Sequence, residues 1–279
     1  MDSNTTDDDL NKKTMNILGV HYKNSFSNHL YIDGVSCLGK TDMLRKIKDS
    51  EGISISYNDL SERCQYIYNN FSNKSTCNIL QSAYSLLNMH LKPRYKCSII
   101  DRSPLTDFWY SIILKVLESM KKEEKKLNIY NNYSIMQKGE LSAKEQLDKF
   151  LFIDPYKLSN IKNYVPNDHT NNDNNNNILL KMILKDIFFM YKTLVVIPHH
   201  YHVPQIFEKM KSRNNGIDIL DPLYVHAQII VFDNLRKYYD LPNFEFYDIN
   251  SNVELFSDKH LEDFKIITLK LYEKQLMSK

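Results

Sequence analysis

The sequence is poor in cysteine and charge-balanced, and it has no long apolar run. The four cysteines, Cys37, Cys64, Cys77 and Cys97, form no C-x-x-C pair, which argues against a zinc ribbon or a disulfide framework and indicates a reducing, intracellular compartment such as the cytoplasm. No apolar stretch approaches the length of a membrane span, and the polar, acidic N-terminus does not resemble a signal peptide. The net charge of +2 predicts no broad nucleic-acid or membrane surface.

Glycine is also scarce, with six in 279 residues, yet two glycines lie close together after an apolar run. Gly34 and Gly39, followed by Lys40 and Thr41, match the phosphate-loop pattern G-x-x-x-x-G-K-[ST]. Such a loop turns a strand sharply into a helix and aims backbone N–H groups at a phosphate. We expect Lys40 to reach the β- and γ-phosphates of a nucleotide and the Thr41 hydroxyl to hold Mg²⁺.

Apolar strand-like runs alternate with helical patterns along the chain, which favours an α/β fold with a parallel sheet covered on both faces. We expect strands at 30–32, 52–57, 97–100, 193–197 and 244–247. We expect helices at 40–48, 61–71, 79–89, 105–126, 142–152, 179–190, 204–211, 222–239 and 258–276, the last capped by Asp258. Trp109 is expected in the core.

The chain reads as one domain over residues 28–279, preceded by a flexible leader over residues 1–27. An Asn-rich tract at 171–177 predicts a surface insertion near 166–177. The bias towards Asn, Lys, Ile and Tyr suggests an AT-rich genome, which would suit a large DNA virus.

Polar residues follow two of the expected strands. Asp101 and Arg102 end a short buried run, at the sheet edge where α/β proteins bind ligands; there an acid can hold Mg²⁺ and an arginine can stabilise a phosphoryl group. Asp59 follows another strand and can act as a general base. The alternatives are a helix cap around Asp101 and turn chemistry at Asp59.

Three further sets of residues can take part in binding. Gln81 lies in an apolar helix, where its amide can pair with a nucleobase edge or simply be an exposed glutamine. Lys209, Lys211 and Arg213 fit a lid whose cations meet ATP phosphates, or a surface charge run. His199, His200 and His202 have no acid or cysteine spaced to complete a zinc site.

Four stretches in a fixed order carry a resemblance to a known family. They are the loop 34–41, Ile79–Tyr84, Ile99–Pro104, and the run from Lys209 to Tyr224. Together these stretches resemble the deoxynucleoside kinase family, which includes viral thymidine kinases and insect multisubstrate kinases. The loop is specific to P-loop proteins in general, and the order of the four stretches is what singles out this family.

The resemblance implies a P-loop NTPase-type three-layer sandwich with a five-stranded parallel sheet, often dimeric. It implies Mg²⁺-dependent transfer of the γ-phosphoryl group of ATP to the 5′-hydroxyl of a deoxynucleoside, thymidine above all, in nucleotide salvage. The partners are then ATP and a small nucleoside, with neither nucleic acid nor membrane.

The same resemblance assigns roles to individual residues. Those implied to bind ATP are Gly34, Val35, Ser36, Cys37, Leu38, Gly39, Lys40, Thr41, Lys209 and Arg213. Those implied to bind the nucleoside are Gln81 at the base, Arg102 at the 5′-oxygen and Asp218 at the sugar 3′-hydroxyl. Thr41 and Asp101 would hold the metal, and Asp59, Lys40 and Arg102 would be catalytic.

The sequence departs from the family at two points. The usual base is a glutamate, often before a proline, and here it is Asp59 without one; lysines replace some lid arginines and lack their bidentate fork.

Three alternative functions remain. One is a thymidylate kinase, for which the helix ending Leu86–His90 lacks an arginine. The others are a nucleotide-binding protein that has lost catalysis and a general P-loop ATPase.

Overall fold

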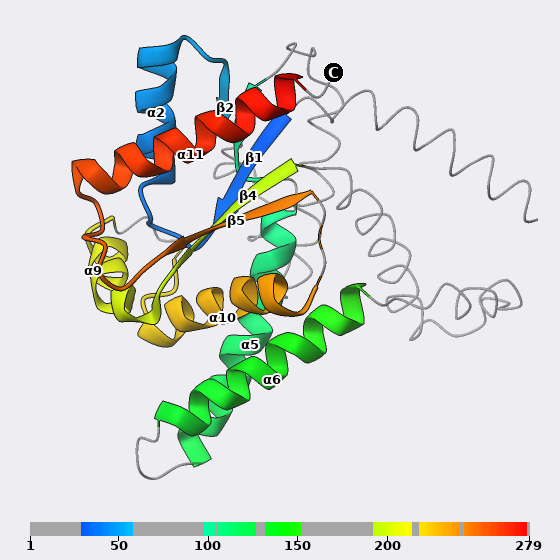
Figure 1. Ribbon diagram of the computed structural model, residues 1–279. Coiled ribbons are helices and arrows are strands. Elements are labelled where there is room, and N and C mark those ends of the chain that lie inside the picture. The colour runs from blue at the N-terminus through cyan, green and yellow to red at the C-terminus, as the bar shows by residue number, and fades with distance from the viewer. Residues whose placement is uncertain are drawn as a thin grey trace, which may run out of the picture.

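A parallel β-sheet forms the centre of the protein. The structure is a computed structural model that describes residues 29–57, 98–103, 105–126, 132–151, 192–213, 218–239, 241 and 243–277. Its five strands are ordered β2-β3-β1-β4-β5, and every neighbouring pair is parallel (Figure 1). The strands are β1 (His29–Gly34), β2 (Ile55–Tyr57), β3 (Ser98–Asp101), β4 (Lys192–Pro198) and β5 (Phe244–Ile249).

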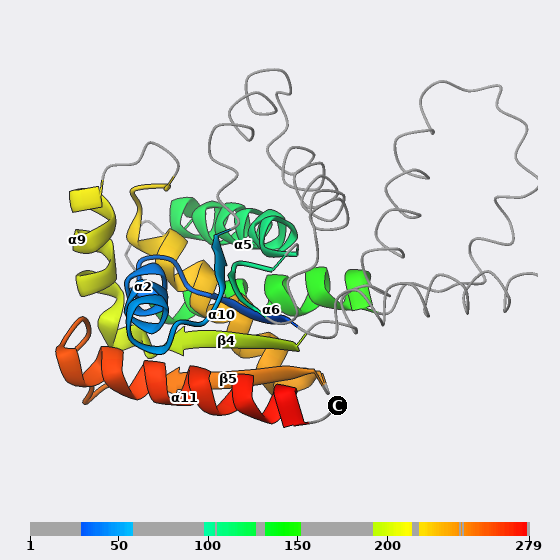
Figure 2. The ribbon, with the colours of Figure 1, turned by 90° about the horizontal axis from the view of Figure 1, so that it is seen from above.

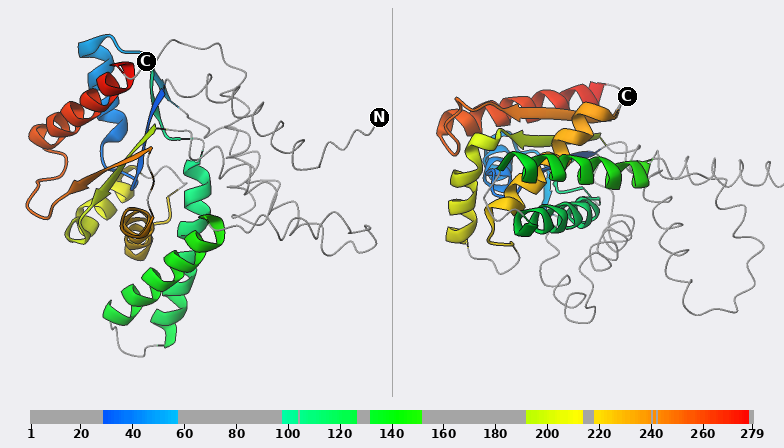
Figure 3. Two further views of the ribbon diagram at one scale, coloured as in Figure 1. Left: turned by 45° about the vertical axis from the view of Figure 1, so that its right-hand side comes forward. Right: turned by 90° about the horizontal axis from the view of Figure 1, so that it is seen from below.

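Helices cover both faces of this sheet. On one face lie α2 (Lys40–Glu51) and α11 (Asp258–Met277), which contact each other and the strands. On the other lie α5 (Thr106–Lys126), α6 (Asn132–Leu151) and α10 (Pro222–Tyr238). The two groups of helices are separated by the sheet in Figure 3. The predicted α/β class, with a parallel sheet flanked by helices, is therefore confirmed.

The carboxyl ends of the strands meet at one edge, where the chain reverses its winding. After β1 the chain enters α2 on one face, whereas after β3 it enters α5 on the opposite face. The 3₁₀ turn η1 (His200–His202) and helix α9 (Val203–Arg213) follow β4 directly, and α9 stands at the same edge in Figure 2. In open α/β sheets this switch point is where ligands bind.

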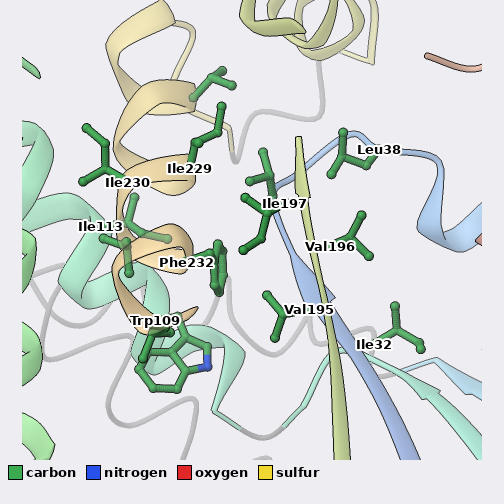
Figure 4. Close-up of a cluster of buried hydrophobic side chains, with 14 of the residues drawn as sticks. Ile32, Leu38, Trp109, Ile113, Val195, Val196, Ile197, Ile229, Ile230 and Phe232 are labelled. Atoms are coloured by element: carbon green, nitrogen blue, oxygen red, sulfur yellow. The ribbon is translucent and has the colours of Figure 1, made fainter. Parts of the chain in front are cut away.

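One part of the core lies between β4 and helix α10, with α5 packed beside α10. Val195 and Ile197 of β4 face Phe232 and Trp109 across this layer, while Val196 points to the other face (Figure 4). Because alternate strand residues point to opposite faces and both faces are buried, the run Leu194–Ile197 is apolar without a break. Trp109 is buried, as predicted from the sequence.

Several predicted boundaries are wrong, each for a local reason. Helix α2 runs to Glu51 and ends at Gly52 in the left-handed conformation, so the following strand begins at Ile55 rather than at Gly52. Helix α6 begins at Asn132, ten residues before the predicted start. Helix α11 is capped by Ser257, whose Oγ accepts from the His260 N–H at 3.2 Å, so Asp258 is inside the helix.

Some predicted features lie outside the described residues. They are the N-terminal leader, the helices expected at 61–71, 79–89 and 179–190, and the Asn-rich tract. None of the helices that the structure describes is long and apolar enough to cross a membrane.

Candidate functional site

The loop between β1 and α2 depends on three residues in left-handed backbone conformations. Gly34 has φ 115°, Cys37 has φ 59° and Gly39 has φ 73°. A Cβ atom on Gly34 would lie 2.2 Å from the carbonyl oxygen of Val196 in β4. The loop therefore lies directly against the centre of the sheet, at a separation that only glycine allows.

The loop leads into a helix N-terminus that has no side-chain cap. Helix α2 starts at Lys40, and its capping position is Gly39, which has no side chain to offer. The first N–H groups of an α-helix have no partners within the helix, and they carry a partial positive charge. An anion is therefore a natural partner for this end of α2.

The Lys40 ammonium group folds back over the loop. Its Nζ donates to the carbonyl oxygens of Val35 and Gly34, the second at 3.3 Å. Burial lowers the pKa of Lys40 from 10.5 to about 8, with the carboxylate of Asp101 acting against this and Arg102 acting with it. A partly desolvated cation in the loop is suited to a phosphate group, which would restore the lost solvation.

Thr41 and Asp101, the two residues predicted to hold Mg²⁺, are in direct contact. The Thr41 hydroxyl donates to Asp101 Oδ2 at 2.8 Å, which joins the start of α2 to the end of β3. A hydroxyl and a carboxylate are hard oxygen ligands of the kind Mg²⁺ takes, with phosphate oxygens and water completing its shell. Within the described ranges no group of three or more His, Cys, Asp or Glu side chains gathers into a metal site.

Arg102 lies next to this pair, in a strained conformation. Its φ is 70°, rare for a residue with a side chain, and its N–H donates to the Ile32 carbonyl of β1 at 3.0 Å. The Arg102 charge lowers the pKa values of both Lys40 and Tyr110. Strain of this kind persists where neighbouring structure enforces it, commonly at functional sites.

Asp33 was not predicted from the sequence, yet it ties β1 to the segment after β3. This carboxylate is 1% exposed and accepts from the Ser103 N–H at 3.3 Å, from the Ser103 hydroxyl and from the Thr106 hydroxyl. Burial raises the pKa of Asp33, while these hydrogen bonds and Lys40 act in the opposite direction. Asp33 therefore fixes the position of the Asp101–Arg102 segment relative to the loop.

The basic end of α9 approaches the loop. Arg213 pairs with Asp218, and the charges of Arg213, Asp218 and Lys209 all act on the Cys37 thiol, whose pKa is raised mainly by burial. Lys209 Nζ also lies 5.5 Å from the centroid of the Phe256 ring. The charges of three residues predicted from the sequence, Lys209, Arg213 and Asp218, therefore act on the loop at Cys37.

The other predicted residues do not gather there. Lys211 pairs with Glu208 on its own helix and lies over the Phe207 ring. The histidines turn to separate partners: His200 Nδ1 lies 2.8 Å from His226 Nδ1, and His202 Nε2 lies 2.8 Å from the Asn250 carbonyl oxygen. Asp59 and Gln81 lie outside the described residues.

Two further residues that the sequence did not single out contact the loop at Ser36. The Ser36 N–H donates to Gln228 Oε1 at 2.9 Å, and the Ser36 hydroxyl lies 2.6 Å from the Tyr110 hydroxyl. Gln228 belongs to α10 and Tyr110 to α5. Gln228 shows the same sequence signal as Gln81, a lone glutamine in an apolar helix, but only Gln81 is singled out from the sequence.

No protein-family model, no curated protein and no solved structure matches this chain. The function is therefore inferred from the residues at the carboxyl edge of the sheet.

Proposed function

We propose that the protein is a P-loop kinase of the three-layer sandwich type. It transfers the γ-phosphoryl group of ATP to the 5′-hydroxyl of a deoxynucleoside, with thymidine as the expected substrate. The observation that carries the proposal is the Thr41–Asp101 hydrogen bond. It brings the end of the glycine loop to the carboxylate at the end of β3, at the switch point of the sheet. A phosphate cradle and a metal-binding acid are then side by side, as phosphoryl transfer requires.

The residues of the chain have distinct parts in this reaction. The loop amides and the α2 N-terminus bind the phosphates. The Lys40 ammonium group has a third N–H beside the two that its carbonyl partners accept, and it meets the β- and γ-phosphates from its place over the loop. Thr41 and Asp101 would hold Mg²⁺, which neutralises phosphate charge when bound. Arg102 stabilises charge on the transferring group, and Lys209 and Arg213 approach the phosphates from α9.

Arg102 favours a kinase over an ATPase. An ATPase would need an acid that activates water at the end of a strand, whereas here Asp101 already bonds Thr41 and the following arginine is near Lys40. The acceptor's proton would go to Asp59, the base expected from the sequence, as the hydroxyl oxygen attacks phosphorus and ADP leaves. A deoxynucleoside as acceptor rests on the resemblance of the four sequence stretches.

The test is an assay of the purified protein with Mg²⁺-ATP, the four deoxynucleosides and thymidine monophosphate. The Lys40→Ala variant should lose at least about a hundredfold in turnover. Lys46→Ala is a matched control, because Lys46 is on the same helix but pairs with Asp258 at the surface. We expect nucleoside phosphorylation in the wild type and in the control.

Other outcomes would redirect the proposal. Phosphorylation of the monophosphate alone would make the protein a thymidylate kinase. ATP binding without transfer to any acceptor would indicate a nucleotide-binding protein that has lost catalysis. Full turnover in Lys40→Ala would refute the assignment of the loop.

A further inference from the structure

The Ser36 position is held from two helices that are remote in the sequence. Gln228 of α10 accepts the Ser36 N–H at 2.9 Å, and Tyr110 of α5 meets its hydroxyl at 2.6 Å. Gln228 is fully buried. The first of these contacts acts on the backbone itself, so it bears on the conformation of the whole loop.

The Val35–Ser36 peptide links Gln228 to Lys40. The described chain has no cis peptide bond, and in a trans peptide the N–H and the C=O point in opposite directions within one plane. The N–H of this peptide is bound to Gln228, and its C=O accepts from Lys40 Nζ. Whatever fixes the N–H therefore also fixes the acceptor that holds the ammonium group.

We propose that Gln228 is a positioning residue that orients the Val35–Ser36 peptide and, through it, holds Lys40 over the loop. This inference rests on the proposed function. The role of Gln228 would determine how well the unliganded loop is arranged to bind the phosphates of ATP. Gln228 acts through the peptide and does not touch the substrate.

The rest of the Gln228 amide is consistent with a role at the loop rather than in stability. Among the residues that the structure describes, its buried Nε2 has no hydrogen-bond partner, and an unpaired buried donor costs free energy. The neighbouring positions of α10 are filled by apolar side chains such as Ile229 and Val225. An apolar residue would suit this environment better, were it not for the Ser36 N–H.

Helix α10 supplies a matched control. Asn234 is also a buried amide of this helix, and its Oδ1 also has no partner within the described part of the chain. Its Nδ2 donates to the Ile230 carbonyl of its own helix, at 2.9 Å. Gln228→Met and Asn234→Met thus remove comparable buried amides, but only the first should act on the loop.

The unliganded protein gives the first test, by NMR. In Gln228→Met we expect amide hydrogen exchange at Ser36 to be at least about tenfold faster, since the N–H loses its acceptor. The ammonium signal of Lys40, identified by its absence in Lys40→Ala, should move or broaden. Asn234→Met should leave both signals unchanged. Unchanged Ser36 exchange and an unchanged Lys40 signal in Gln228→Met would overturn the inference.

ATP supplies the second test. Gln228→Met should raise the Kd of ATP about tenfold, equal to about 1.4 kcal/mol, with the KM of the nucleoside changed less than about twofold. Equal losses in the two methionine variants would mean a merely structural role and would also overturn the inference. If the wild type bound no ATP, the proposed function would fail, while the NMR measurements would still decide whether Gln228 positions Lys40.

Discussion

The carboxyl edge of the sheet and the core beneath α5 and α10 differ in the kind of residues that form them. The edge contains Gly34 and Arg102 in left-handed conformations, a buried Asp33, and a Lys40 whose pKa is lowered to about 8. The core is made of apolar side chains that are almost entirely buried, among them Ile113 and Phe232. The strained Arg102 backbone and the burial of Asp33 and Lys40 each cost free energy, whereas burial of the apolar core stabilises the fold.

The comparison shows which substitutions should separate stability from function. In the core, a smaller side chain should lower the free energy of unfolding and leave nucleotide binding unchanged. At the edge, loss of a polar group should reduce binding or turnover with little change in stability. Gly34 is the exception, since it belongs to the loop and also packs against β4.

Gly34→Ala should therefore have the largest effect. The new Cβ would overlap the Val196 backbone, and φ 115° is unfavourable for alanine, so we expect a loss of about 4 to 6 kcal/mol in unfolding free energy. Urea denaturation followed by circular dichroism measures it. Gly52→Ala is the control, because φ there is 64° but no atom of the described ranges lies within 4 Å of the added Cβ; about 1 kcal/mol is expected. Equal losses in the two variants would contradict the close approach to β4.

Ile113→Ala should come next. Ile113 is 0% exposed and faces α10 in Figure 4, so its truncation should cost about 3 kcal/mol of stability. The KM of ATP should stay unchanged at temperatures where the variant is folded. Ile266→Ala, on the exposed side of α11, should cost less than about 1 kcal/mol. A rise in the ATP KM of Ile113→Ala would show that the core and the edge are coupled.

Thr41→Val tests the edge at nearly constant shape. It removes the hydroxyl that bonds Asp101, and we expect turnover to fall about a hundredfold with the melting temperature changed by only a few degrees. Thr193→Val removes a buried hydroxyl in β4 that has no hydrogen-bond partner among the described residues, and it should leave turnover unchanged. Unaltered turnover in Thr41→Val would argue against a metal ligand at this position.

Acid should lower the stability through the partly buried histidine pair, His200 and His226. Burial lowers the pKa of His226 from 6.5 to about 4, and the same cause lowers that of His200, near Asp233, Lys237 and His199. Between these pH values the unfolded chain binds more protons, so stability should fall as the pH drops from 6.5 to 4, by on the order of 2 kcal/mol. Chemical denaturation at pH 7.5 and 5 measures this slope. His226→Phe should flatten the slope, and a slope as steep as that of the wild type would contradict this origin.

The sequence predicted best those features whose signal is local. The apolar runs of β1 and β4 and the glycine spacing of the loop identified the central strands and the phosphate-binding candidate. Lys40, Thr41 and Asp101 were named from the sequence, and the structure brings them together. The carboxyl ends of the strands in a parallel sheet lie at one edge. A motif directly after each strand is therefore enough to predict that the motifs lie close together.

Features that depend on distant packing were missed. Helix α6 begins at Asn132 although Gly139 lies within it, and a Cβ at Gly139 would come within 2.9 Å of Ile230 and 3.0 Å of Met120. The glycine serves a close approach of three helices, which no local pattern reveals. Asp33 and Gln228 were missed for a similar reason, because their partners are 70 and 192 residues away in the sequence.

The place of β1 in the sheet also has a consequence for biosynthesis. Leu30 is among the first described residues to leave the ribosome, but one of its two strand partners is Lys192. At translation rates of about 5 to 20 residues per second, the roughly 160 residues between them take about ten to thirty seconds to appear. During that interval the edge of β1 that β4 later covers has unpaired backbone groups, and the strand is rich in apolar side chains. The nascent chain therefore presents a site for chaperones, and overexpression without them should favour aggregation.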